Sequence, residues 1–348
     1  MEQSTPVIVT KKRIRVEFEG KLSFKERLIM KLTSTSFWVD KVWYLFRFLI
    51  LLGISYVILS PFFTRIFQSF MAREDFMDMT VSLIPKNFSV DIYKYLVKEN
   101  GYFEAMGNTF LLSLICAVLQ TLVCCMVGYG VSKFKFKGRK LILLLVIITM
   151  VVPPKTLQLS FMQHFTAFDI GKVISWNYTG IIELIFGKTP NLTSTFWPFV
   201  ILSLIGCGFK NGLYIFMMVQ FFKGVPDELE ESAYVDGSGP FRTFWQIIIP
   251  LSVPMMVTIF LFAFSWQWTD EFYTGMFIPS VATDKILVMS DVYKTIPKSL
   301  QSNAAGHQLY DSAIQNTAGM MIIAPLIIVY LFGQKYLVQG IERTGLVG

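Results

Sequence analysis

Six long apolar segments run through this chain, and they restrict it to folds that cross a lipid bilayer. A hydrocarbon core about 30 Å thick is spanned by about 20 helical residues. The segments are Val42 to Arg65, Thr109 to Val131, Leu141 to Phe161, Thr195 to Phe222, Leu251 to Phe272 and Ala313 to Gly333. The composition agrees, since 53% of the residues are hydrophobic and 16% are charged, whereas about 25% are charged in soluble domains. We therefore expect an all-α, polytopic membrane protein with six transmembrane helices.

The distribution of lysine and arginine predicts which loops lie in the cytoplasm. Cytoplasmic loops are enriched in these residues, and the rule works best on short loops. Five of them fall in the eight residues from Lys133 to Lys140, and nine fall in the first 41 residues. We place both stretches and the C-terminus in the cytoplasm. The sequence thus predicts a basic cytoplasmic extension over residues 1–41 and a transmembrane domain over residues 42–348.

Few side chains in this sequence are suited to catalysis or to metal binding. The four cysteines all lie in apolar segments without metal-ligand spacing, so we expect them to be buried hydrophobic residues. His164 and His307 fall in separate polar loops, which leaves little material for a zinc site or a histidine-based triad. The isoelectric point is near 9.1. The excess of basic residues is explained by membrane topology and by attraction to anionic lipid, because these residues flank the apolar segments. We expect a non-catalytic chain that binds no metal, cofactor or nucleic acid.

The stretch between the fourth and fifth apolar segments, about residues 223–250, is charged and broken by glycine. Pro226 and the carboxylates after it indicate a helix start, since proline fits the first turn and acidic groups stabilise the positive end of the helix dipole. We expect a short helix to about Val235, a break at Gly237, and a second short helix before Pro250. Two short helices at an angle would form a compact knob for a groove on a cytoplasmic partner.

This stretch resembles the ATPase-docking loop of permease subunits in bacterial carbohydrate-uptake ABC transporters of the maltose-permease type. The motif of that family has Glu-Ala-Ala, then Asp-Gly, and then Phe, Ile and Pro at set spacing. The corresponding residues in this sequence are Glu231, Ser232, Ala233, Asp236, Gly237, Phe244, Ile247 and Pro250. Glu230, which directly precedes them, is also assigned to the docking loop. Ser232 and Ser238 stand where the family usually has alanine, and both are small enough for the close packing that the motif implies.

The resemblance covers most of the chain. Residues 84–109, 150–154 and 266–270 are similar to the family's first outer loop and to the ends of its third and fifth spans. The basic extension and the stretch from about Asp169 to Pro190 depart from the family pattern. The fold expected from the resemblance is that of a type I ABC importer permease, in a bacterial plasma membrane.

The resemblance also implies the partners. The chain would pair with a second, similar permease and with two cytoplasmic ATPase subunits, which bind ATP and Mg²⁺. It would receive a sugar or oligosaccharide from an extracellular binding protein. Glu231 would face a basic residue of the ATPase, and Gly237 would allow the turn. ATP-driven closure of the ATPases would then move the knob as a rigid body and tilt spans four and five.

Four residues are candidates for the translocation pathway. Lys210 and Asn211 lie within the fourth apolar segment, and a charged residue at membrane depth normally faces a cavity or a partner helix. Trp266 and Trp268 could stack on sugar rings, although tryptophan belts at the membrane interface are the commoner arrangement.

Two other classes of protein are alternatives. An ion-coupled secondary transporter predicts several carboxylates within the spans and an internal repeat, and these spans hold almost no carboxylates. A polytopic membrane enzyme predicts an acidic constellation at a membrane face. The acidic cluster in this sequence runs from Asp227 to Asp236, and the docking loop already accounts for it.

Overall fold

The computed structural model describes residues 35–169, 180–278, 286–301 and 307–345. In these ranges the chain is helical and contains no strand, apart from an isolated antiparallel bridge between Met71 and Phe88. Contacts within the chain divide it into two units, residues 1–63 and 64–348, and each is described by itself. Most of the predicted basic extension lies outside the described residues.

The first unit contains most of helix α2 (Thr35–Gln68). Its large apolar side chains, from Trp38 to Leu59, are exposed around the whole helix. A helix that is apolar on all sides is suited to lipid or to packing against other helices. The stretch Trp38–Gln68 is long and apolar enough to cross a membrane, and it contains the first predicted span.

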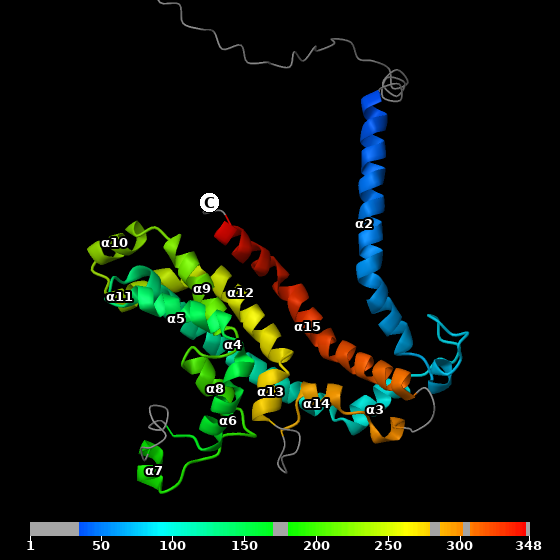
Figure 1. The fold of residues 1–348 in the computed structure, drawn as a ribbon. Helices are drawn as coiled ribbons and strands as arrows, with labels where there is room; N and C mark the ends of the chain where they lie inside the picture. The colour runs from blue at the N-terminus through cyan, green and yellow to red at the C-terminus, as the bar shows by residue number, and fades with distance from the viewer. Residues whose placement is uncertain (1–34, 170–179, 279–285, 302–306, 346–348) are drawn as a thin grey trace, which may run out of the picture. The chain divides into compact units, whose positions relative to one another are not determined.

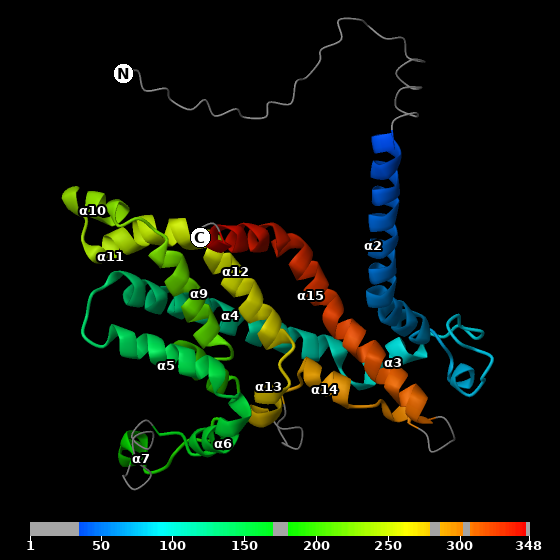
Figure 2. The ribbon, with the colours of Figure 1, turned by 45° about the horizontal axis from the view of Figure 1, so that its top comes forward.

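Three helices form the centre of the second unit, namely α4 (Tyr102–Lys133), α9 (Asn211–Lys223) and α12 (Ile249–Trp268). Helix α4 packs against both α9 and α12, and α15 (His307–Gly345) packs along α12 (Figures 1 and 2). The side chains between them are apolar and fully buried, among them Cys124, Met218, Phe222 and Ile259. Helices α4 and α15 thus contain the second and sixth predicted spans. Helix α12 contains the fifth only as far as Trp268, because Phe272 begins a separate short helix.

The fourth predicted span, Thr195 to Phe222, is not one helix. It consists of α8 (Trp197–Leu204) and α9, separated by residues 205–210. Lys210 is the last residue of this break, and its backbone is in the left-handed region with a φ of 65°. This conformation is strained for residues other than glycine. Cys207 lies in the break and is exposed, so the expectation that every cysteine is buried is wrong at this position.

The third predicted span, Leu141 to Phe161, is bent. Helix α5 (Arg139–Val151) ends just before Pro153 and Pro154, and the helical stretch after it turns by 98°. Two consecutive prolines remove backbone donors and exclude the helical conformation from the residue before each ring. The described residues therefore contain four helices that could cross a membrane, or up to five if the bent pair is one span.

The remaining short helices lie at the two ends of this helical group. Near the start of α4, Asn100 Nδ2 donates to the carbonyl oxygens of Val292 and Thr295, and Thr109 Oγ1 accepts from the Met289 backbone N–H. These bonds fix the segment before α15 against the start of α4. The short elements of this end are η1 (Arg73–Phe76), α3 (Asp91–Glu99), η2 (Pro154–Leu157), α6 (Gln158–Thr166), α7 (Ile181–Phe186), α13 (Phe272–Phe277), α14 (Met289–Lys294) and η5 (Lys298–Leu300).

Candidate functional site

The chain between α9 and α12 forms a helical knob at the other end of the group (Figure 2). Its first helix, α10 (Glu228–Val235), ends at Val235 as the sequence predicts, but it begins at Glu228, two residues after Pro226. At its end, the Ser238 N–H bonds the Ala233 carbonyl at 2.9 Å, and the Gly237 N–H bonds the Tyr234 carbonyl at 3.1 Å. This pair of bonds is a Schellman motif, which requires a left-handed residue. Gly237 supplies it, with a φ of 82°.

The second short helix differs from the prediction. Helix α11 (Pro240–Thr243) continues through a π-helical stretch, η4 (Phe244–Ile248), directly into α12. Pro250 therefore does not separate the knob from the fifth span. A proline ring clashes with the carbonyl four residues earlier, and the wider π turn just before Pro250 keeps the chain helical by changing the hydrogen-bond register.

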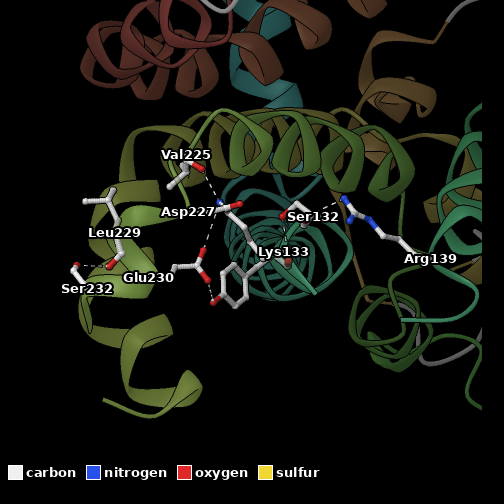
Figure 3. A network of polar contacts seen from close by, with 9 residues as sticks. Ser132, Lys133, Arg139, Val225, Asp227, Leu229, Glu230 and Ser232 are labelled. Carbon is white, nitrogen blue, oxygen red and sulfur yellow. Dashed lines mark hydrogen bonds and ion pairs between the residues drawn. The ribbon is translucent and has the colours of Figure 1, made fainter. Parts of the chain in front are cut away.

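A polar clamp fixes α10 to the end of α4 (Figure 3). The Lys133 ammonium donates to the Val225 carbonyl at 2.6 Å and to Asp227 Oδ1 at 2.5 Å, and it lies 3.6 Å from Glu230 Oε1. Tyr129 Oη donates to Glu230 Oε2 at 3.0 Å. Lys133 and Glu230 are almost completely buried, so solvent screens their attraction only weakly. We call Tyr129, Lys133 and Glu230 the clamp.

Asp227 is the exposed member of this contact. Its carboxylate is 79% exposed while the Lys133 side chain is 8% exposed. The hydrogen bond and charge of Lys133 hold the pKa of Asp227 below its ordinary value, so the carboxylate stays ionised. Glu228, Glu230 and Glu231 occupy the first turn of α10, where negative charge stabilises the helix dipole.

An aromatic contact fixes the second half of the knob to the same residue of α4. The Tyr129 ring lies 4.9 Å from the Phe244 ring and 5.6 Å from that of Phe222, measured between centroids. Phe244 is 7% exposed, and Ile248 is fully buried. Tyr129 therefore connects α4 with α10 through its hydroxyl, and with η4 and α9 through its ring.

The predicted docking residues divide into two groups in the structure. Glu230, Ala233 and Phe244 are buried inside the chain and hold the knob in place. Ile247 is half-buried. The others are exposed and available to a partner, namely Glu231, Ser232, Asp236, Gly237 and Pro250.

An apolar tip, which the sequence motif does not include, lies beside the exposed acidic residues. Val235 is 87% exposed and Phe241 is 77% exposed, and Trp245 lies next to Phe241 with 6.2 Å between ring centroids. Exposed apolar side chains gathered in one place are typical of a protein interface. Val235 ends α10 and Phe241 lies at the start of α11, so the two residues flank the turn at Gly237. Their position beside this turn is the feature of the sequence that could have indicated their exposure.

The clamp partners Tyr129 and Lys133 were also missed as site residues. The sequence marked Lys133 only as one of five basic residues in a short loop. Its contact with α10 joins residues 94 positions apart, and no local pattern records such a pairing.

The four pathway candidates occupy different environments. Lys210 is exposed, and its ammonium lies 4.9 Å from the centroid of the Trp266 ring. Trp266 is 45% exposed, whereas Asn211 is 1% exposed. Trp268 is 3% exposed and donates its indole N–H to the Ile322 carbonyl. It forms part of the wall of a cavity of about 160 Å³ between α12, α14 and α15. The structure thus brings together Lys210 and Trp266.

No group of three or more metal-binding side chains occurs in the part of the chain that the structure describes. The helical fold and the anchored loop define a multi-pass membrane permease. A sequence model described as the binding-protein-dependent transport system inner membrane component matches residues 120–343, and the chain belongs to this family. It is an ABC transporter permease and a multi-pass protein of the plasma membrane.

Individual relatives agree with this assignment. The protein LplC of Bacillus subtilis is 25% identical over 295 residues, which are 83% of this chain and 89% of LplC. The maltodextrin transport system permease protein MalD of Streptococcus pneumoniae is 28% identical over 298 residues, 86% of this chain and 93% of MalD. A crystal structure of a bacterial ABC transporter that imports the acidic polysaccharide alginate contains a similar fold. The two structures superpose with a TM-score of 0.61 and are 21% identical in sequence. The superposition covers 87% of this chain and 98% of the chain in the alginate transporter.

Proposed function

We propose that this chain is one of two permease subunits of an ATP-driven importer for an oligosaccharide. In this proposal it has six spans with both termini in the cytoplasm. An extracellular binding protein delivers the sugar, and two cytoplasmic ATPase subunits bind ATP and Mg²⁺. The observation that carries the proposal is the knob between α9 and α12, which presents Glu231, Asp236 and an apolar tip while its other face is anchored to α4.

The substrate class rests on the relatives. MalD is named for maltodextrin transport, another relative from Bacillus subtilis for arabinooligosaccharides, and the structural neighbour imports alginate. These substrates differ in sugar and in charge, but all are chains of sugar units. An oligosaccharide is therefore the substrate class that they share.

The knob would transmit the ATPase movement to the spans. It is continuous with α9 on one side and with α12 on the other, and the clamp ties it to α4. A force on α10 would therefore act on three packed helices at once. Packed helices respond to such a force by small rigid-body shifts and rotations. Rotation of these helices would open the pathway alternately to the two sides of the membrane.

Purification of the full complex tests this proposal. We expect an ATPase and a second permease to co-purify with this chain, and a binding protein loaded with oligosaccharide to stimulate ATP hydrolysis. Glu231→Lys should abolish the stimulation, because it reverses the charge on the exposed face of α10 while the spans still insert. Glu104→Lys is the control, since Glu104 lies in the first turn of α4, at the end remote from the knob, and is also exposed. Normal stimulation in Glu231→Lys would exclude docking through this residue, and uptake driven by an ion gradient alone would exclude the importer.

A further inference from the structure

Polar side chains from three helices meet beside the break between α8 and α9. Gln120 of α4 and Asn211 of α9 are each 1% exposed, and Gln267 of α12 is 5% exposed. Gln120 Nε2 donates to Ser203 Oγ at 3.2 Å. These uncharged amides lie deep among apolar helices, where polar groups are retained only with hydrogen-bond partners.

Several polar atoms of this cluster have no protein partner among the described residues. They are Gln120 Oε1, both amide atoms of Asn211, and Gln267 Nε2. A buried donor or acceptor without a partner is destabilising, because it has lost its hydrogen bonds to water. The cluster contains both kinds of atom, since Oε1 accepts and Nε2 donates. Its missing partner must therefore be able to do both.

Gln120 and Gln267 line a space of the size of one water molecule. A cavity of about 10 Å³ is lined by polar and aromatic side chains that include Gln120, Ser203, Gln267 and Tyr273. One water needs about 10–15 Å³ and two to four polar partners. Gly208 also lines the cavity, and a Cβ at that position would lie 2.9 Å from Gln120 Nε2 and 3.3 Å from Asn211 Oδ1. Glycine therefore leaves room where the amides approach each other.

The charge of the site favours a neutral occupant. The nearby carboxylate of Asp270 already accepts from the backbone N–H groups of Tyr273 and Thr274 and from Thr274 Oγ1. The side chains with unpartnered atoms are amides, and two of them, Asn211 and Gln267, offer N–H groups. A cation prefers a shell of oxygen atoms and gains nothing from a donor.

We propose that the break in the fourth span is a binding site for a buried water molecule. The water donates to Gln120 Oε1 and accepts from Gln267 Nε2, and it joins α4 to α12 beside the end of α8. This bridge gives a partner to Gln120 Oε1 and to Gln267 Nε2 without closing the break. The break therefore persists within an apolar layer, where backbone and side-chain polar groups need partners.

Thermal unfolding of variants with side chains of similar volume tests this proposal, because the melting temperature changes in opposite directions with and without the water. If water bridges the amides, Gln267→Met removes one of its partners and leaves Gln120 Oε1 unpaired, so the melting temperature of the purified complex falls. If the site is dry, the change removes an unpaired buried N–H donor and the melting temperature rises, which overturns the proposal. Gln220→Met, at an exposed glutamine of α9, is the control and should leave the melting temperature unchanged.

Radiolytic labelling of the wild-type complex provides a second measurement that does not depend on the variants. Hydroxyl radicals formed from bound water label the side chains next to it. We expect Phe199, which lines the cavity and is 4% exposed, to be labelled faster than Phe264, which is 3% exposed and does not line it. Equal labelling would overturn the proposal. A melting temperature that rises in sodium chloride but not in choline chloride would also overturn it, in favour of a cation.

Discussion

The hydroxyl of Tyr129 donates a 3.0 Å hydrogen bond to Glu230 Oε2, and so joins the last turns of α4 to the first turn of α10. Glu230 and Glu231 are neighbours in sequence, but Glu230 is buried against α4 and Glu231 is exposed. Successive residues of a helix point about 100° apart because a turn holds about 3.6 residues. One acidic residue therefore anchors the knob, and the next is free for a partner.

Removal of either ionic member of the clamp should destabilise the permease. Lys133→Met leaves the Glu230 carboxylate buried without its cation, and Glu230→Met leaves the Lys133 ammonium without one of its anions. Breaking a buried pair in this way costs about 3–5 kcal/mol. We expect the double variant to lose much less than the sum of the single losses, because it leaves no unpaired buried charge. Thermal melting of the four complexes measures this coupling, and additive losses would contradict it. Asp227→Asn is the control and should cost at most about 1 kcal/mol, since its carboxylate is exposed.

Tyr129→Phe separates the two contacts of this residue. It keeps the ring against Phe244 and removes the hydrogen bond to a charged group, which contributes about 1.5–3 kcal/mol. If the clamp transmits movement, stimulated ATP hydrolysis should continue while transport per ATP hydrolysed falls. The ratio of sugar uptake to ATP hydrolysis in proteoliposomes measures this effect. An unchanged ratio would show that the hydrogen bond contributes only to stability.

Gly237→Ala should cost about 1–2 kcal/mol, the penalty of placing a Cβ in the left-handed conformation. Steric contact does not contribute, because a Cβ at Gly237 has no atom within 4 Å. Gly239→Ala is a matched control: its Cβ also has free space, but its φ is −76°. We expect thermal melting to show a loss for the first variant and no loss for the second. Equal effects would show that the backbone conformation is not the cause.

The apolar tip should contribute to assembly and not to the stability of the permease. Phe241→Ser should leave the melting temperature of the permease unchanged, because the side chain is 77% exposed, but should reduce the ATPase that co-purifies with it. Phe244→Ser should instead destabilise the permease itself by several kcal/mol, about the 3–5 kcal/mol known for Phe→Ala in cores. A full yield of ATPase with Phe241→Ser would exclude the tip from the interface.

The two tryptophans should respond differently to replacement by phenylalanine. Trp268→Phe loses the hydrogen bond to the Ile322 carbonyl and should cost about 0.5–1.5 kcal/mol. Trp266→Phe should not affect stability, because Trp266 is half-exposed, but it should lower sugar uptake if its ring lines the pathway. Uptake assays and thermal melting of both variants separate these roles, and normal uptake with Trp266→Phe would remove it from the pathway.

The knob shows how much of the candidate site could be predicted from the sequence. Pro226, the acidic turn and Gly237 are local signals, and they predicted the end of α10 correctly and its start to within two residues. The prediction failed where two local preferences competed. Pro250 indicated a boundary before the fifth span, but the π turn at Phe244–Ile248 maintains the helix through it. The fourth apolar segment indicated one span, but the structure divides it into two helices.

The sequence by itself determined that this is a helical membrane protein with a structured loop of the permease family, because hydropathy, turn residues and motif spacing are all local properties of the chain. Only the tertiary structure decided what each loop residue does. Burial separated Glu230 from Glu231, and packing against α4 brought in Tyr129 and Lys133 from about 100 residues away. The same packing placed Gln120, Asn211 and Gln267 side by side. Such pairings depend on how helices cross in space, and a linear pattern of residues does not encode them individually.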